Sequence, residues 1–217
     1  MKMRKLMALL MSVVTIAALT SCKTSKSETP AEEEGKTIVI YYSQTGATKT
    51  VAEELASKLG CDIAAIEAVN PYDGDYPSTI ARWMEEKKDS VKVELKPLGV
   101  NLDNYDRVFL GFPIWGGTYA LPIASFLADN DLNGKEVVTF ATFGSGGIEN
   151  ATVDVAVALP GAEVKQGYGV RNARISKASE EISRFLDEEG YISGEDEIES
   201  LPAFSEQAPV SDEEAAI

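Results

Sequence analysis

A short polar segment at residues 43–48, with the sequence SQTGAT, carries the side chains best suited to bind an anion. Ser43, Thr45 and Thr48 can each donate a hydroxyl hydrogen bond, and Gly46 allows the backbone to approach a ligand closely. Together with nearby backbone N–H groups, they would hold a phosphate with little help from positive charge. The segment fits neither a P-loop, in which Gly precedes the Lys, nor the G-x-G-x-x-G fingerprint of dinucleotide-binding proteins. Taken alone, it fits equally well an ordinary strand-to-helix turn with a Ser or Thr N-cap.

An aromatic segment at residues 112–119 has the sequence FPIWGGTY and contains two consecutive glycines. Such a cluster is unusual for an exposed loop, and it would form one wall for a flat ring, with Trp115 stacked on it. Gly116 and Gly117 would let the backbone change orientation beneath that ring. In the alternative interpretation, Trp115 packs into the core and the two glycines make a turn.

A third segment, at residues 143–147, has the sequence FGSGG. Its small residues allow close approach of the backbone and expose several N–H donors. A flexible strand-to-helix turn is an equally good interpretation of this segment when it is taken alone.

All three segments follow runs of β-branched and aromatic residues that are typical of strands buried on both faces. The predicted strands span residues 37–42, 61–66, 107–111, 136–142 and 163–170, with a short edge strand at 91–95. The predicted helices span residues 51–59, 78–89 (with Ser78 as N-cap), 122–128, 149–159 and 176–188. This alternation predicts a parallel sheet covered on both faces, with the three segments at its carboxyl edge, where such sheets bind ligands.

The residue inventory limits the chemistry. The chain has 217 residues, a net charge of −15, two Cys residues and no His. Without His, neither Ser-His-Asp nor Cys-His catalysis is available, and an ordinary zinc site is disfavoured. The acidic balance argues against nucleic acid as a partner. Cys61 opens an apolar run and is predicted to be a buried, inert thiol. A catalyst with this inventory would depend on a bound cofactor.

The N-terminus has the features of a targeting segment. A positively charged start is followed by apolar residues 6–19 and then by Leu-Thr-Ser-Cys, which ends at Cys22 and resembles a bacterial lipobox. We therefore predict a lipoprotein signal peptide at residues 1–21 and lipid on Cys22. This lipid would anchor the protein in the cell envelope, outside the cytoplasm, on the periplasmic side or at the cell surface. A simple secretory signal, in which Cys22 is incidental, is the alternative.

The remainder of the chain divides by composition into three parts. Residues 22–35 are polar and are predicted to form a flexible tether. Residues 36–190 have the length and the apolar content of one folded domain. Residues 191–217 are acidic, with scattered apolar residues, and are predicted to be a loosely ordered tail.

Three stretches of the sequence together resemble the flavodoxin family: IYYSQTGATKTVAEEL, FLGFPIWGGTYALP and TFATFGSGG. The resemblance covers residues 36 to about 189, and it implies a flavodoxin-like three-layer sandwich. This α/β fold has a five-stranded parallel sheet of order 2-1-3-4-5, with helices on both faces and FMN at the switch point. By this resemblance, the FMN phosphate would be held by Ser43, Gln44, Thr45, Gly46, Ala47 and Thr48. The isoalloxazine would be flanked by Pro113, Ile114, Trp115, Gly116 and Gly117. Its polar edge or other face would be lined by Thr142, Phe143, Gly144, Ser145 and Gly146.

The resemblance implies an FMN-binding electron carrier whose partner is a redox protein or a small-molecule acceptor. Two alternatives remain open: an FMN-dependent reductase of quinones or other small acceptors, and a flavin-free, membrane-tethered binding protein. The long stretch at residues 67–105, which carries its own helix, departs from a typical flavodoxin. Its aromatic residues would either cover the ring or pack into the core: Tyr72, Tyr76 and Trp83.

Overall fold

The described part of the protein comprises residues 35–192 of a computed structural model. The predicted signal peptide, Cys22, nearly all of the tether and the tail beyond Ile192 lie outside these residues. Within residues 35–192, no helix has both the length and the apolar composition that a membrane span requires.

A parallel sheet forms the centre of the fold, in the strand order β2-β1-β3-β5-β6. Its strands are β1 (Thr37–Tyr41), β2 (Asp62–Ala65), β3 (Arg107–Trp115), β5 (Glu136–Phe143) and β6 (Glu163–Arg171). Counted along the parallel strands alone, this is the expected order 2-1-3-4-5. A sixth strand, β4 (Thr118–Tyr119), was not predicted, and it pairs antiparallel with the end of β3.

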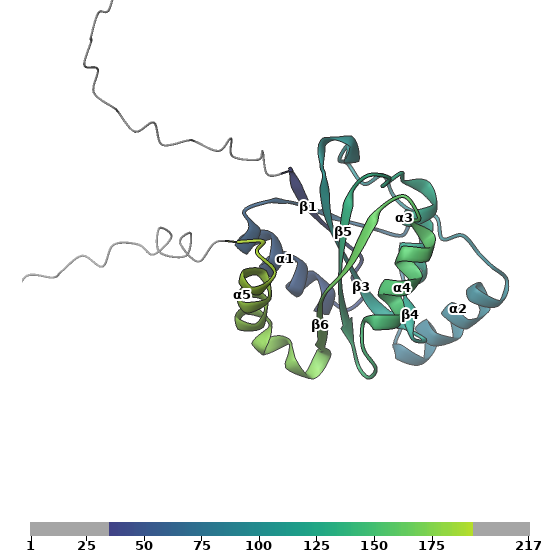
Figure 1. Ribbon diagram of the computed structural model, residues 1–217. Helices are drawn as coiled ribbons and strands as arrows, with labels where there is room; N and C mark the ends of the chain where they lie inside the picture. Colours follow the sequence, from purple (N-terminus) through teal and green to yellow (C-terminus); the bar gives the residue numbers. More distant parts are fainter. Residues whose placement is uncertain (1–34, 193–217) are drawn as a thin grey trace, which may run out of the picture. The chain divides into compact units, whose positions relative to one another are not determined.

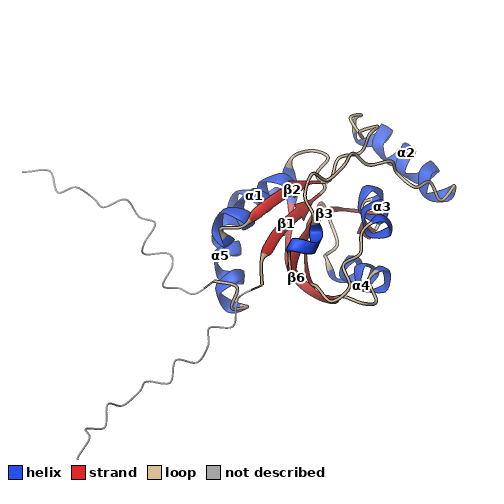
Figure 2. Ribbon diagram, turned by 90° about the horizontal axis from the view of Figure 1, so that it is seen from above, coloured by secondary structure: helices blue, strands red, loops and turns tan. Residues whose placement is uncertain are grey.

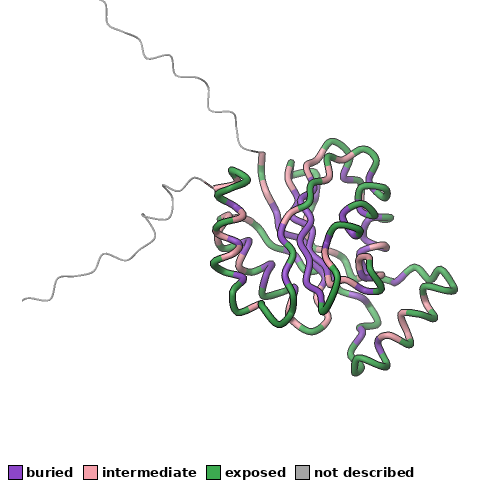
Figure 3. The backbone as a smooth tube through the Cα atoms, turned by 60° about the horizontal axis from the view of Figure 1, so that its bottom comes forward, coloured by how far each residue is buried: buried purple, intermediate pink, exposed green. Residues whose placement is uncertain are grey.

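Two layers of helices cover the sheet (Figures 1 and 2). One face is covered by α1 (Ala47–Leu59) and α5 (Ala178–Glu188), and the other by α3 (Leu121–Asp129) and α4 (Glu149–Ala158). Successive strand residues point to opposite faces, so Val39 packs with α1 and α5 while Ile38 and Ile40 belong to the other core cluster. Figure 3 shows the buried strands between the exposed outer surfaces of the helices.

A long excursion between β2 and β3 carries the helix α2 (Tyr76–Lys88), which projects from the edge of the fold in Figure 2. Its N-cap is Asp75 and not Ser78 as predicted, because the Asp75 carboxylate accepts the Ser78 N–H at 2.9 Å. Pro77 at the start of α2 suits that position, since its fixed φ is helical and it needs no N–H partner there.

The predicted edge strand at residues 91–95 is absent, and the backbone there makes a single antiparallel bridge between Leu95 and Ala68. The pairing does not extend to residues 71 and 92, because Pro71 has no N–H to continue the ladder. Two short 3₁₀ helices complete the described chain: η1 (Leu102–Asn104) and η2 (Asn172–Lys177).

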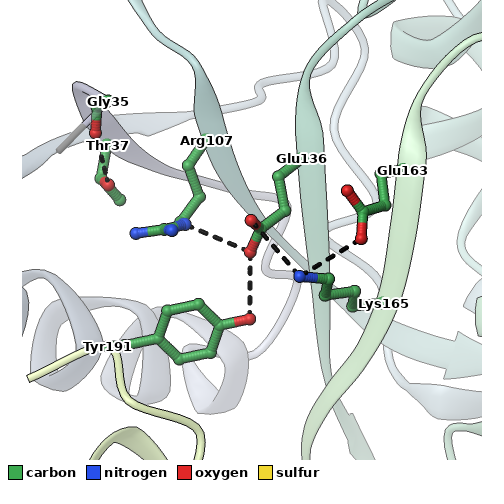
Figure 4. Close-up of polar contacts among 7 residues, drawn as sticks. All are labelled: Gly35, Thr37, Arg107, Glu136, Glu163, Lys165 and Tyr191. Atoms are coloured by element: carbon green, nitrogen blue, oxygen red, sulfur yellow. Dashed lines mark hydrogen bonds and ion pairs between the residues drawn. The ribbon is translucent and has the colours of Figure 1, made fainter. Parts of the chain in front are cut away.

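A cluster of polar side chains joins the amino ends of β3, β5 and β6, at the edge of the sheet opposite to the three predicted ligand-binding segments (Figure 4). The Glu136 carboxylate accepts hydrogen bonds from Arg107 Nε at 3.2 Å and Tyr191 Oη at 3.1 Å. Lys165 Nζ lies 3.5 Å from the same carboxylate. Burial by itself would raise the pKa of Glu136, but these partners hold it below its ordinary value. The cluster therefore fastens the segment after α5 to the sheet.

Candidate functional site

The structure brings the three segments identified from the sequence to one edge of the sheet. They follow β1, β3 and β5, which are adjacent and parallel, so their carboxyl ends meet. The Tyr42 N–H donates to the Gly111 carbonyl at 2.9 Å, which joins the first segment to β3. The Thr48 and Thr142 hydroxyls lie 2.8 Å apart and join the first segment to β5.

The first segment ends in an open helix N-terminus. Gly46 is the N-cap of α1, with a φ of 93°, and as a glycine it has no side chain that could cap the first turn. The first helical bond runs from the Thr50 N–H to the Gly46 carbonyl. The N–H groups of Ala47, Thr48 and Lys49 therefore have no partner within the helix, and they sit at the positive end of its dipole. This geometry favours an anion.

The three predicted hydroxyl donors differ in their surroundings. Thr48 is only 1% exposed and Thr142 only 2%, and their hydroxyls bond to each other, so Thr48 acts as a brace between the two segments. Ser43 is half-buried, and its oxygen accepts the Gly46 N–H at 3.2 Å, which leaves its hydroxyl hydrogen available. Thr45 is exposed at the tip of the loop.

The second segment is a hairpin. Trp115 pairs with Thr118 across Gly116 and Gly117, whose φ angles are 56° and 87°. Positive φ at both central residues is typical of a two-residue type I′ turn, and both glycines are exposed.

The Trp115 indole packs inward, with 6% of its surface exposed. It makes edge contacts with the rings of Tyr72, at 4.9 Å between centroids, and Tyr42, at 5.9 Å. The structure thus places Trp115 in the core and the glycines in a turn, as in the second interpretation of the sequence. Its stacking on a ligand ring stays a prediction. Pro113 and Ile114, which precede it, are partly buried at the end of β3.

The third segment leaves β5 with Thr142 and Phe143 buried, and it then exposes Gly144, Ser145 and Gly146. A cavity of about 340 Å³ lies on its β6 side. The cavity is lined by equal numbers of acidic and basic residues: Glu149, Glu181, Arg171 and Arg174. Because Arg174 also bonds to Glu181, the charges alone favour no class of ligand for this cavity.

One further element, helix α2, reaches this edge; it belongs to the long stretch whose aromatic residues the sequence predicts either to cover the ring or to pack into the core. Helix α2 contacts the first segment through Gln44, whose side-chain amide donates to the Thr79 hydroxyl at 2.7 Å. It contacts the second segment through Trp83, whose indole lies against Gly116. The signal available in the sequence was the aromatic content of the long stretch that carries α2.

Two tyrosines near this edge, Tyr42 and Tyr72, are held in their neutral forms. Burial, and then the hydrogen bond to Glu86, raise the pKa of Tyr72 above its ordinary value, and burial does the same for Tyr42. At the opposite edge of the sheet, Cys61 is partly buried and not fully buried as predicted, but burial still raises its pKa to about 11, as expected for an unreactive thiol. Residues 35–192 contain no group of three side chains placed to hold a metal ion. The edge is thus suited to bind an anion beside a flat group, without an activated nucleophile.

Comparisons with known proteins agree with this architecture. The flavodoxin family model matches residues 36–188. A crystal structure from Bacteroides eggerthii, described as that of a flavoprotein, has 30% sequence identity and a TM-score of 0.61, and the match covers 70% of this chain and 96% of that one. A second, from Bacteroides uniformis, has 30% identity and a TM-score of 0.61, over 69% of this chain and 98% of that one.

A flavoprotein from Lactobacillus acidophilus, solved in complex with FMN, has 24% identity and a TM-score of 0.54, over 67% of this chain and 99% of that one. This similarity shows the fold alone. No curated protein matches the chain. The doubly wound parallel sheet, with its open helix N-terminus at the carboxyl edge, defines a flavodoxin-like protein. The chain belongs to the flavodoxin family.

Proposed function

We propose that this protein binds FMN at the carboxyl edge of its sheet and serves as an electron carrier. The observation that carries the proposal is the uncapped N-terminus of α1, which lies beside an exposed turn of two glycines. Its place between β1 and β3 is the position where doubly wound sheets bind ligands.

The residues present fit the phosphate of such a cofactor. Nothing lies within 4 Å of where a side chain on Gly46 would begin, so the space beside the free N–H groups is open. The first turn of α1 contains no acidic residue that would repel an anion. The residues that would hold the phosphate are Ser43, Gln44, Thr45, Gly46, Ala47 and Thr48. Of these, Thr48 would act mainly through its backbone, because its hydroxyl is paired with Thr142.

The other two segments fit a flat ring with polar edges. Gly116 and Gly117 present exposed backbone on one side, and the third segment presents exposed small residues on the other. The residues assigned to the ring are Pro113, Ile114, Trp115, Gly116, Gly117, Thr142, Phe143, Gly144, Ser145 and Gly146. When bound, FMN supplies electron-transfer chemistry that no side chain in this set can perform.

The composition of this set favours a carrier over an enzyme that moves protons. None of the assigned residues is an Asp, Glu, Lys or His, so the chain offers no general acid or base among them. An FMN-dependent reductase of quinones or other small acceptors is the second candidate. It is favoured by the 340 Å³ cavity next to the third segment, which would admit a small molecule.

The setting of this activity is also part of the proposal. The lipobox-like sequence that ends at Cys22 supports a lipid anchor and a place in the cell envelope, outside the cytoplasm. The partner would then be a redox protein or a small acceptor in that compartment. Mass spectrometry of the protein from membranes would reveal the lipid on Cys22.

The test is an FMN titration of the chain from Lys23 to Ile217, so that Cys22 is not lipidated. We expect one FMN per chain, with the visible absorption bands kept after desalting. Thr45→Asp places a negative charge at the exposed tip of the phosphate loop and should weaken FMN binding by about tenfold or more, because like charges repel. Thr45→Asn, which has nearly the same shape and no charge, is the matched control. A wild-type chain that does not retain FMN would leave a flavin-free binding protein as the remaining function.

A further inference from the structure

Trp83 of α2 occupies the space directly above the hairpin turn. A side-chain carbon built on Gly116 would lie 2.2 Å from Cη2 and 2.5 Å from Cζ2 of Trp83. The benzenoid edge of this indole therefore rests on the Gly116 backbone, at the turn that we assign to the ring of FMN. Glycine is required at this position for two reasons, the positive φ and the contact with Trp83.

The contacts that hold α2 in this place are few, and most are polar. Thr79 is the only residue of α2 that is fully buried, and its hydroxyl accepts the Gln44 amide at 2.7 Å. Arg82 lies 3.9 Å from the centre of the Tyr72 ring and bonds to Glu86 at 2.7 Å. The position of α2 is thus tied to the phosphate loop through Gln44 and to the hairpin through Trp83.

The indole N–H of Trp83 is enclosed, and among residues 35–192 no acceptor bonds to it. Buried polar groups are nearly always hydrogen-bonded, and an exception calls for a physical reason. Here the orphaned donor lies beside the edge where a ligand is expected. An acceptor atom on that ligand would satisfy it, and the apolar part of the same side chain would cover a flat ring.

We infer that Trp83 is the aromatic residue that lies against the ring of bound FMN, with its indole N–H donating to a polar atom of that cofactor. The inference rests on the proposed FMN binding, and it names a residue outside the three segments found in the sequence. Trp115 is the less suitable wall, because its indole is enclosed by Tyr42 and Tyr72. Thr79, through its bond to Gln44, is a positioning residue that keeps Trp83 above the turn.

The chain contains two tryptophans, which permits a matched experiment. Wild-type protein and the variants Trp83→Phe, Trp83→Leu and Trp115→Phe are titrated with FMN. Two quantities are recorded: the Kd, and the fluorescence of the bound flavin. An indole in contact with the flavin quenches its emission strongly. The melting temperature of each variant, measured without FMN, shows whether the fold is intact.

We expect Trp83→Leu to raise the Kd by about tenfold, which corresponds to 1.4 kcal/mol, and to increase the emission of bound FMN. Trp83→Phe keeps an aromatic ring but lacks the N–H, so its Kd should lie between those of wild type and Trp83→Leu. Trp115→Phe should keep the flavin quenched. Thr79→Val should raise the emission in part, because α2 loses its bond to Gln44.

The possible failures are distinguishable. If wild-type protein does not bind FMN, the proposed function fails and the inference fails with it. If wild-type protein binds FMN but Trp83→Leu binds it equally well and with equal quenching, only the inference is wrong. The same conclusion holds if Trp115→Phe, and not the Trp83 variants, restores the emission.

Discussion

The paired hydroxyls of Thr48 and Thr142 should behave as one unit in the stability of the protein. They lie 2.8 Å apart and join segments that are 94 residues apart in the sequence. Both side chains are at most 2% exposed, so water cannot replace a lost partner. Thr48→Val or Thr142→Val removes one hydroxyl at nearly constant shape and leaves the other buried without its partner.

The magnitude follows from this burial. An unpaired buried hydroxyl costs about 1–3 kcal/mol, whereas replacing both partners by apolar groups of the same shape is nearly neutral. Each single variant should therefore lose about 1–2 kcal/mol of unfolding free energy, a cost within the range for an unpaired hydroxyl. The double variant Thr48→Val/Thr142→Val should lie within about 1 kcal/mol of wild type. The coupling energy of the double-mutant cycle, which is the two single losses together less the loss in the double variant, is then about 1–4 kcal/mol.

Urea unfolding of the four proteins, followed by circular dichroism, measures this coupling. The slope of unfolding free energy with urea must stay the same for the comparison to hold. If the double variant loses the sum of the two single losses, the hydroxyls do not act as a pair, and the brace between the two segments is refuted.

An FMN titration of the same double variant separates a brace from a phosphate ligand. If the Thr48 hydroxyl serves only as a brace, the double variant should bind FMN within about threefold of wild type, a difference of roughly 0.6 kcal/mol. The core offers a matched control in Thr139 and Thr152, whose hydroxyls lie 2.7 Å apart. Replacing both by Val should affect stability, because the hydrogen that is not used between the two hydroxyls can bond to a backbone carbonyl, and it should leave FMN binding unchanged.

Three further predictions concern other parts of the fold. Gly116→Ala should displace Trp83 and weaken the packing of α2 while the sheet stays folded. Amide hydrogen exchange should then become faster in α2 alone, and unchanged exchange in α2 would contradict the close contact between Trp83 and Gly116. Glu136→Gln should lower the free energy of unfolding by its full amount above a pH of about 4.3, the pKa of Glu in the unfolded chain. This loss should shrink as the pH falls through the lower pKa that Glu136 has in the folded protein, which urea unfolding between pH 7 and pH 3 would reveal. Cys61 should react with a disulfide reagent at pH 8 roughly a hundredfold more slowly than a free thiol, with a rate that still rises at pH 10; a plateau near pH 9 would argue against this pKa.

Much of the fold could be predicted because its elements are encoded locally. The apolar run after Lys36 and the helical spacing of Val51 and Leu55 predict β1 and α1 from neighbouring residues alone. Helix ends were less predictable. For α1, the sequence suggested a Ser or Thr as N-cap in one interpretation, but the N-cap in the structure is Gly46. For α2, the N-cap is Asp75, three residues before the predicted Ser78. Several nearby polar residues can satisfy the same N–H groups, and only the path of the entering chain selects one.

The sequence by itself determined the class of fold, the three segments of the candidate site and the absence of histidine chemistry. These properties depend on residue types and on short-range periodicity. Only the tertiary structure decided where the two tryptophans lie. Trp115 lies within the recognised segment but turns into the core, whereas Trp83 reaches Gly116 from a helix more than 30 residues earlier in the chain. This contact depends on how the long segment between β2 and β3 folds back on the sheet, and the local sequence pattern does not predict the course of that segment.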